Sequence, residues 1–257
     1  MIQQAKNYTV KSVDKVLDIA ELLRQEPNGM TITEICMATK LPKSTIHGLL
    51  HTLADRGYLV ADESTKRFKL GLKFFEIGYS YLNNLNLSEE IRVILTEVAK
   101  KGSETVHLAI LDGTDVVYIE KIESGHEIRM ASFVGKRLPA HATGVGQAML
   151  SCLSEEELSS RYKNKNLQKF TEHTVTTLEE LKNKLELARK NGYAFDDQES
   201  SGGIQCVAVP VFNRHGKMVA GLSVSVPVFR MVPGRKEELL QMVREGARKL
   251  ARVWLAS

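Results

Sequence analysis

The chain has 257 residues, 43% of them apolar and 26% charged, which is the composition of an ordinary globular protein longer than one average domain. No apolar run approaches the roughly 18 residues that span a bilayer, and the N-terminus lacks the apolar core of a signal peptide, so we exclude a membrane protein and expect a cytoplasmic one. The net charge of +4 is modest, and Cys36, Cys152 and Cys206 lie too far apart for a metal knuckle or a disulfide framework.

The segment before residue 41 predicts two helices. Residues 11–24 carry an apolar stripe, and a proline and a glycine within 26–29 end this helix. Residues 33–40 predict a short second helix with Thr33 as its N-cap. The stripe of the first helix that we expect to be buried consists of Val13, Val16, Leu17, Ala20 and Leu23.

Residues 41–53 predict a third helix, whose polar face reads DNA. Pro42 stops the preceding helix, and Ser44 is placed to cap the next one. Two helices joined by a tight turn form a helix-turn-helix, and the segments 57–60 and 68–70 around a polar turn predict a hairpin, or wing. The third helix has an apolar face with Ile46, Leu49, Leu50 and Leu53, and a polar face with Lys43, Thr45, His47, His51 and Thr52.

The distribution of charge supports contact between this region and DNA. Residues 1–75 contain 11 Lys and Arg against 8 Asp and Glu, or +3, and the remaining chain contains 24 against 23, or +1. Basic side chains that meet phosphates add affinity without reading sequence. A solvated surface is the alternative for each of them. The DNA-binding candidates are Lys43, Ser44, Thr45, His47, His51, Lys66 and Arg67.

His47 and His51 are also four residues apart, as are the two zinc ligands on a metalloprotease helix. In such a helix a glutamate follows the first histidine, whereas Gly48 stands there in this chain. We therefore expect no metal site.

The rest of the chain predicts a linker helix and an α+β domain. Residues 72–85 and 88–101, the latter capped by Ser88, are helical in pattern, and so are 155–161, 178–191, which Gly192 closes, and 235–255. Strand patterns cover 106–111, 116–122, 128–134, 204–212 and 218–226. Hairpins at both ends with helices between them predict an antiparallel sheet with helices packed on it. The expected domains are 1–71, 72–86 and 87–257.

Small and polar residues in the second half predict a site for a small organic acid. The loop at Gly144 leads into a helix that we expect to begin near Gly146, where backbone N–H groups and the helix N-terminus favour a carboxylate. Ser223 and Ser225 lie on one face of a strand. Each of these residues also has a purely structural interpretation, because serines are often merely tolerated in strands. Cys206 on the adjacent strand and Asp196 complete the set.

Four motifs, taken in order, resemble the IclR family of bacterial transcriptional regulators, and the resemblance covers nearly the whole chain. It implies a winged helix-turn-helix, a linker helix and a C-terminal GAF-like effector-binding domain, assembled as dimers or dimers of dimers on palindromic double-stranded operator DNA. The motifs are Leu41-Pro-Lys-Ser-Thr-Ile-His47, Leu138-Pro-Ala-His-Ala-Thr-Gly-Val-Gly-Gln-Ala148, Gly192-Tyr-Ala-Phe-Asp196 and Gly203-Ile-Gln-Cys-Val-Ala-Val-Pro-Val211.

The resemblance also implies site residues and shows one departure. Family members commonly have an arginine where this chain has Gly48. Glycine inside a helix costs about 1 kcal/mol relative to alanine, so we expect a closer approach of the backbone to DNA or to the neighbouring helix in compensation. Carried over by motif, the family's small-acid pocket falls on Gly144, Val145, Asp196, Cys206, Ser223 and Ser225.

The predicted function is that of a DNA-binding repressor of a catabolic operon, controlled by a small carboxylic or keto acid. Sugar acids, keto acids such as glyoxylate and aromatic acids all fit such a pocket. We expect no cofactor and no catalytic residue. Two alternatives stay open: a DNA-binding protein whose C-terminal domain only oligomerises, and an enzyme with Cys206 as nucleophile and His141 or His107 as base.

Overall fold

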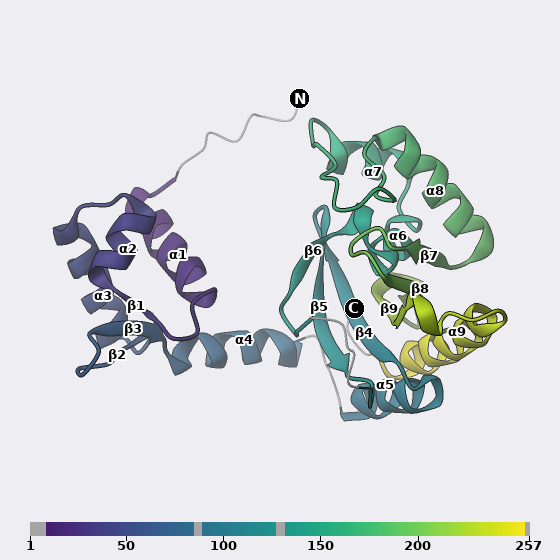
Figure 1. The fold of residues 1–257 in the computed structure, drawn as a ribbon, viewed down its shortest axis with the longest axis horizontal. Coiled ribbons are helices and arrows are strands. Elements are labelled where there is room, and N and C mark those ends of the chain that lie inside the picture. Colours follow the sequence, from purple (N-terminus) through teal and green to yellow (C-terminus); the bar gives the residue numbers. More distant parts are fainter. Residues whose placement is uncertain (1–8, 85–88, 127–131, 255–257) are drawn as a thin grey trace. The chain divides into compact units, whose positions relative to one another are not determined.

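The computed structural model describes residues 9–84, 89–126 and 132–254, and the chain divides into two compact units, 1–83 and 84–257 (Figure 1). Each unit has its own apolar core. No helix among the described residues combines the length and the hydropathy that crossing a membrane requires.

The N-terminal unit is a bundle of helices with a small sheet. Strand β3 pairs with both β1 and β2 in an antiparallel arrangement, which confirms the expected hairpin and adds β1 to it. The elements are α1 (Lys11–Arg24), β1 (Met30–Thr31), α2 (Ile32–Thr39), α3 (Lys43–Asp55), β2 (Leu59–Ala61), β3 (Arg67–Leu70) and α4 (Leu72–Asn84). They enclose a core of Ile19, Leu23, Ile35, Ile46, Leu50, Leu53, Leu59 and Phe68.

Two expected helix caps are wrong. Thr31, not Thr33, caps α2: its hydroxyl accepts from the backbone N–H of Glu34, and the Glu34 carboxylate accepts from the backbone N–H of Thr31. This reciprocal pair satisfies two backbone donors that a helix leaves free. Helix α3 follows Pro42 directly, and Ser44 lies within its first turn, where it forms no cap hydrogen bond.

The expected buried stripe of α1 is wrong for two residues. Val13 and Leu17 are 54% and 57% exposed, whereas Ile19 and Leu23 are buried. The apolar residues of α1 spread over more than one face, and only the face with Ile19 and Leu23 meets α2 and β3. Val13 and Leu17 thus lie outside the core of the N-terminal unit.

The C-terminal unit is a six-stranded antiparallel sheet with the order β6-β5-β4-β9-β8-β7. Its architecture confirms the α+β prediction. The strands are β4 (Thr105–Asp112), β5 (Asp115–Ile122), β6 (Arg137–Pro139), β7 (Ala194–Asp197), β8 (Ile204–Phe212) and β9 (Met218–Pro227). The helices are α5 (Glu89–Gly102), α6 (Gly144–Leu150), α7 (Glu155–Tyr162), α8 (Leu178–Asn191) and α9 (Arg235–Val253), with 3-10 turns η1 (Ala140–Ala142) and η2 (Val228–Arg230).

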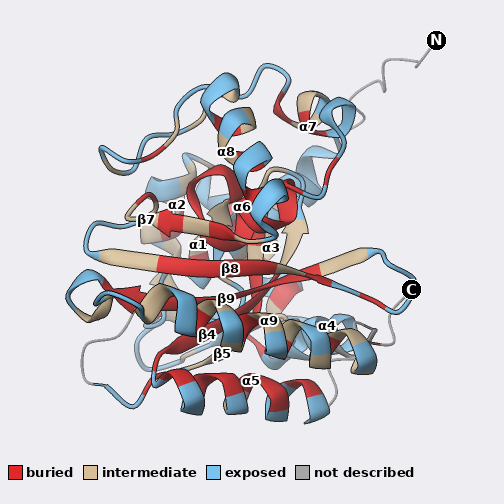
Figure 2. Cartoon of the chain, turned by 90° about the vertical axis from the view of Figure 1, so that its right-hand side faces the viewer, coloured by how far each residue is buried: buried red, intermediate tan, exposed pale blue. Residues whose placement is uncertain are grey.

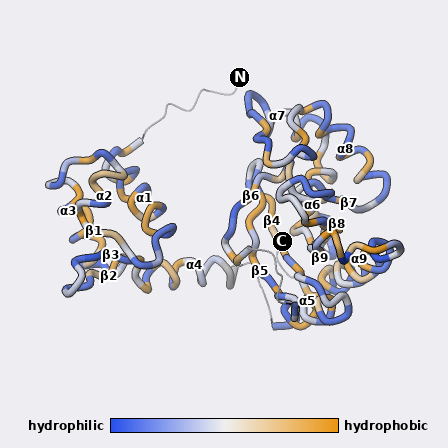
Figure 3. The backbone as a smooth tube through the Cα atoms, viewed as in Figure 1, coloured by the Kyte–Doolittle hydropathy of each residue, from blue (hydrophilic) through white to orange (hydrophobic). Residues whose placement is uncertain are grey.

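Helices cover both faces of this sheet. Helices α5 and α9 pack on the face that carries Leu222, Val224 and Val226, and α6 and α8 pack on the other face. The middle strands and α6 are buried, and α5 is buried on one side only (Figure 2). Hydrophobic and hydrophilic residues accordingly alternate along the covering helices (Figure 3). The candidate residues for the acid site lie on the sheet face that α6 covers.

Several predicted bounds in this unit need correction. Of the strand expected at 128–134, residues 128–131 lie outside the described residues, as does the Ser88 cap, and residues 132–134 are not in a strand. The edge strand is instead β6, which pairs with β5. Helix α6 begins at Gly144 rather than near Gly146, because Thr143 caps it through the backbone N–H of Gly146. Strand β7 was not predicted.

Candidate functional site

The first candidate surface is the outward face of α3. Lys43, Ser44, His47 and His51 are exposed and Thr45 is half-buried, while Ile46, Leu50 and Leu53 fix the opposite face in the core. The rings of His47 and His51 lie 4.3 Å apart between centroids. An exposed row of hydrogen-bonding groups on a helix held by its buried side is what reading a major groove requires. Among the described residues, no group of three or more potential ligands could hold a metal ion.

Gly48 lies on this exposed face. A Cβ added there would have no atom within 4 Å, so no neighbouring helix in the described unit requires the glycine. Of the two compensations we considered for its cost, closer packing on a neighbouring helix is therefore wrong. A closer approach to DNA stays a prediction.

In the wing, the Lys66 side chain is exposed, whereas the Arg67 side chain is hydrogen-bonded to other residues of the same unit. Lys66 is exposed in the β2–β3 turn, where it has a left-handed φ of 55°. The turn is held by Asp62, whose pKa is lowered by hydrogen bonds from Ser64 and Thr65. Arg67 donates to the carbonyl of Gly29 at 2.7 Å and to both carboxylate oxygens of Glu34 at 3.1 and 3.0 Å. Arg67 thus ties β3 to the start of α2, whereas the exposed Lys66 stays a candidate for phosphate contact.

The second candidate site is a row of polar residues across four neighbouring strands. The strand register pairs Thr105 with Ser225, Ser225 with Cys206, and Cys206 with Asp196. These side chains share the sheet face opposite to the apolar core of α5 and α9, because successive residues of a strand point to opposite faces. Ser223 lies on the same face. The sheet therefore brings together Asp196, Cys206, Ser223 and Ser225, as expected.

A buried hydrogen-bond chain continues this row. The Cys206 thiol donates to the Ser225 hydroxyl at 3.2 Å, and that hydroxyl lies 3.4 Å from Nδ1 of His107. Nε2 of His107 lies 2.7 Å from the Ser132 hydroxyl, and the His107 ring stacks on Tyr118 with 4.5 Å between centroids. All of these residues are buried. Sequence reasoning considered His107 only as a catalytic base and missed this role, although its alternation with Thr105 along one strand is the signal that places it on this face.

Burial keeps this chain uncharged. It lowers the pKa of His107 to about 3, with further lowering by the charges of Lys121 and Lys136. It also raises the pKa of the Cys206 thiol well above its usual range. Because the thiolate is the nucleophile, a thiol with a raised pKa is poorly suited to covalent catalysis. The other candidate base, His141, is hydrogen-bonded through Nε2 to the carbonyl of Gln168 at 3.0 Å rather than to Cys206.

Asp196 lies against Gly144, the residue beside which we expect a ligand carboxylate. Its carboxyl group accepts from the backbone N–H of Glu199 at 2.7 Å, and the nearby backbone of Gly144 at the start of α6 also acts to lower its pKa. A Cβ added to Gly144 would lie 3.1 Å from Cβ of Asp196 and 3.4 Å from Cβ of Cys206, so the glycine permits this close approach. Burial raises the pKa of Asp196 to about 7. Val145, next to Gly144, is also buried. A ligand bound beside Asp196 would contact a carboxyl group that is about half protonated near neutral pH.

A second network, centred on the buried side chain of Glu199, joins α6 and α8 to the segment that follows β7. Glu199, 1% exposed at its side chain, forms an ion pair with Lys184 of α8. Nε2 of Gln147 donates to Glu199 at 2.7 Å and to the carbonyl of His141 at 2.8 Å. The Thr174 hydroxyl donates to the Glu199 carbonyl at 2.6 Å. Sequence reasoning missed Gln147, Lys184 and Glu199, whose separation along the chain gives no local signal.

Comparison with known families covers both units. Residues 12–63 match the IclR helix-turn-helix domain, and residues 79–252 match the domain described as "Bacterial transcriptional regulator IclR C-terminal". The chain is 35% identical over 243 residues to the HTH-type transcriptional regulator KdgR of Escherichia coli, covering 95% of this chain and 92% of that protein. It is 32% identical over 243 residues to the Transcriptional repressor IclR of Escherichia coli, covering 94% and 89%.

Solved structures agree with this match. The Thermotoga maritima IclR structure has a TM-score of 0.79 and 30% identity, and the match covers 97% of this chain and all of that one. An IclR homolog of Microbacterium hydrocarbonoxydans, crystallised with 4-hydroxybenzoate, has a TM-score of 0.83 at 23% identity, covering 96% and 100%, a similarity of fold.

Proposed function

The chain belongs to the IclR family of bacterial transcriptional regulators, and we propose that it represses a catabolic operon under the control of a small carboxylic or keto acid. The curated relatives are transcriptional regulators rather than enzymes. The observation that carries the proposal is the buried polar row of Ser225, Cys206 and Asp196 on the sheet face next to α6. Hydroxyl and thiol groups, together with a carboxyl group whose pKa of about 7 leaves it half protonated near neutral pH, suit the polar end of a small acid.

For the DNA-binding part, we propose that α3 reads base edges through Thr45, His47 and His51 and that Lys43, Ser44 and Lys66 contact phosphates. Residues 1–71 form the reading head in this proposal, 72–86 the linker and 87–257 the effector domain. Arg67 then acts indirectly, because its guanidinium holds the wing through Glu34. The proposed target is a palindromic operator.

We propose that the chain binds such an operator as a homodimer or a dimer of dimers. Large apolar side chains are exposed on α1 and on α4, outside the core of their unit. They include Val13 and Leu17 of α1 and Leu72, Phe75 and Ile77 of α4, all more than half exposed. A monomer rarely exposes so many large apolar groups unless they form an interface. A second copy that covers them gives two reading heads for two half-sites.

Replacing His51 with alanine is expected to reduce operator preference. If His51 contacts a base edge, its loss costs about 1–3 kcal/mol at the preferred duplex and little on random duplex. Lys66→Ala serves as the contrast, because losing a phosphate contact weakens both duplexes alike and lowers the salt slope by roughly one. The measurement is fluorescence anisotropy on a duplex selected from a random library. Equal loss on both duplexes for His51→Ala would contradict base reading by this residue.

The effector part of the proposal predicts that Ser223→Ala weakens the response to acid and leaves ligand-free DNA binding unchanged. A buried hydroxyl that binds the ligand contributes about 1 kcal/mol, or several-fold in affinity. Thermal shift and operator release are measured with glyoxylate, a sugar acid and 4-hydroxybenzoate, and Ser160→Ala on exposed α7 is the control. If Ser223→Ala weakened DNA binding equally with and without acid, acid binding by the C-terminal unit and DNA binding by the N-terminal unit would not be the separate functions proposed.

The mechanism requires that the acid bind the DNA-free and DNA-bound conformations with different affinities, since equal binding shifts nothing. The linker then transmits the change to the spacing of the two reading heads. The second candidate function is a C-terminal unit that only assembles. It predicts that no acid stabilises the protein in the same thermal-shift series.

A further inference from the structure

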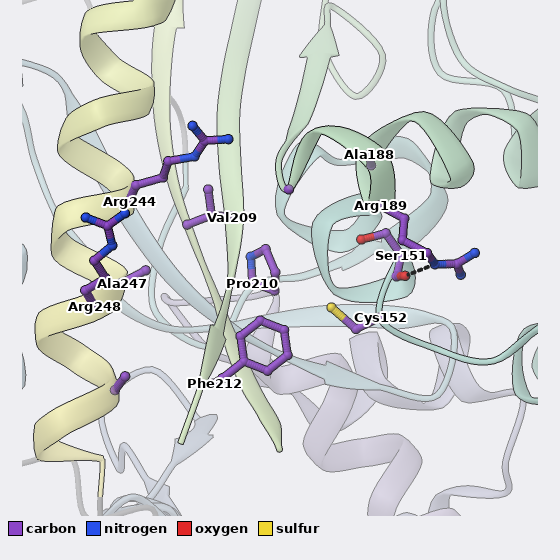
Figure 4. Close-up of a pocket in the computed structure, with 12 residues that line it drawn as sticks. Ser151, Cys152, Ala188, Arg189, Val209, Pro210, Phe212, Arg244, Ala247 and Arg248 are labelled. Carbon is purple, nitrogen blue, oxygen red and sulfur yellow. Dashed lines mark hydrogen bonds between the residues drawn. The ribbon is translucent and has the colours of Figure 1, made fainter. Parts of the chain in front are cut away.

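A groove in the C-terminal unit, distinct from the polar row, is lined by α9, the far half of β8 and the ends of α6 and α8. Its volume is about 560 Å³, which lies in the range of small-molecule sites. Figure 4 shows Arg244, Ala247 and Arg248 of α9 along one wall, Val209, Pro210 and Phe212 of β8 in the middle, and Ser151, Cys152 and Arg189 along the opposite wall. None of the residues of the polar row lines it.

The groove exists because β7 covers only half of its neighbour. β7 pairs with β8 from Gln205 to Ala208, so the edge of β8 from residue 209 to 212 is left without a strand beside it. Pro210 lies in this open stretch and has no N–H to offer to a further strand. Proline at a sheet edge blocks strand addition, so the occupant of the groove is not a strand of a partner protein.

The charges on the groove walls are all positive. Three arginines line the groove and no acidic residue does. Arg189 donates to the carbonyls of Ser151 and Leu153 at 2.8 and 3.0 Å, and Arg244 donates to the carbonyl of Asn191 at 2.8 Å. These carbonyls are uncharged, and neither arginine forms an ion pair with the described residues. Arg248, one helical turn from Arg244, has no hydrogen bond or ion pair with the part of the chain that the structure describes.

The remaining surface is apolar. Ala188, Val209, Phe212, Ala247 and Ala251 line the groove, and Phe212 is 40% exposed there. Apolar walls exclude water and strengthen the attraction between the arginines and an anion. Guanidinium groups also match the planar geometry of a carboxylate.

We propose that this groove is a second ligand site, which takes a small amphipathic organic anion with its acid group on Arg248 and Arg244 and its apolar body along β8. The site goes beyond the proposed effector pocket, because it binds a longer apolar chain and holds the acid group with arginines. Neither Ser225 nor Asp196 lines this groove. We therefore expect binding of the anion in the groove not to depend on these two residues.

Cys152 provides a local readout, because it is exposed and lines the groove, whereas Cys36 lies in the other unit and Cys206 is buried. The full chain is alkylated with iodoacetamide in the presence of octanoate below its micelle concentration, and modification of each cysteine is followed by peptide mass spectrometry. We expect octanoate to slow alkylation at Cys152 and to leave the rate at Cys36 unchanged. The neutral analogue 1-octanol is expected to protect far less.

Two variants make the test specific. Arg248→Gln keeps most of the side-chain length and removes the charge, and we expect roughly ten-fold weaker protection by octanoate. Arg252→Gln, an exposed arginine of α9 outside the groove, is expected to behave as the parent. The proposal is overturned if octanoate gives no protection, if 1-octanol protects equally, or if Arg248→Gln protects as well as the parent. Protection that rises with protein concentration alone would assign the groove to a second copy and overturn it too.

Discussion

Replacing Asp196 with asparagine is expected to stabilise the C-terminal unit at pH 8 and to remove much of the pH dependence of its stability. The Asp196 carboxyl is 2% exposed, and its burial raises the pKa to about 7 from the usual 3.8. A shift of one pKa unit corresponds to about 1.4 kcal/mol, so keeping this group ionised in the folded state costs on the order of 4 kcal/mol. Asparagine removes that cost and retains an oxygen that accepts from the backbone N–H of Glu199.

The sign of the effect follows from proton uptake. Between about pH 4 and pH 7 the unfolded chain has released this proton and the folded chain still holds it, so stability falls as pH rises through that window and levels off above it. Asp196→Asn should therefore match the parent near pH 4 and exceed it by roughly 3–4 kcal/mol at pH 8. Urea unfolding is followed by the fluorescence of Trp254, the only tryptophan, which is buried in the core of this unit.

Asp197 is the matched control, one residue along the same strand. A hydrogen bond from Gln205 lowers the pKa of Asp197, so its shift has the opposite sign. Asp197→Asn should lose a little stability at pH 8 and gain none. If Asp196→Asn were less stable than the parent at pH 8, the folded state would stabilise the Asp196 carboxylate instead of raising its pKa, which contradicts the prediction.

The elements that carry strong local signals were predictable from the sequence. Helix α8 begins and ends at the expected residues because Thr177 and Glu180 form a capping box and Gly192 adopts a left-handed φ of 71°. Strand β8 also has its expected bounds, since it is an apolar run between turns. Local chemistry alone determines such boundaries.

The arrangement of the polar row was predictable only in part. The alternation of Ser223 and Ser225 placed them on one face, but the pairing of Cys206 with Asp196 depends on β7, which is four residues long and gives little periodic signal. The position of Asp196 against Gly144 depends on a contact across 52 residues of sequence. No spacing rule predicts that contact, so the sequence could not show that the Asp196 side chain lies against Gly144 at the start of α6.

The ion pair between Lys184 and the buried Glu199 could not be predicted from the sequence either, because the two residues lie on different elements. Breaking this pair is expected to have a large effect on stability. Lys184→Met is expected to destabilise the C-terminal unit by about 3–5 kcal/mol at neutral pH, because it leaves a buried carboxylate without its cation. The Glu199 side chain is 1% exposed and that of Lys184 28%. Methionine keeps the apolar length of the lysine, so lost packing contributes little.

Lys182→Met on the same helix is the control for Lys184→Met. Lys182 pairs with Glu155 at 2.6 Å, but these side chains are 35% and 80% exposed. An exposed pair contributes about 0–1 kcal/mol, so the two substitutions differ only in the burial of the partner carboxylate. Both are measured by urea unfolding with Trp254 fluorescence. Similar losses for the two variants would mean that burial of Glu199 is not the cause.

The double variant Lys184→Met/Glu199→Gln separates charge from geometry. Glutamine at 199 removes the unpaired charge and keeps an oxygen for the Gln147 amide, which donates to Glu199 at 2.7 Å, so most of the lost stability should return. Lys184 also lowers the pKa of Asp196, and Glu199 raises it. The single variant should therefore shift the pH dependence of unfolding further toward the alkaline side, and the double variant should shift it back part of the way. A stability loss that the second substitution fails to reverse would instead show that Lys184 acts through the packing of α8 on β7 and not through its ion pair with Glu199.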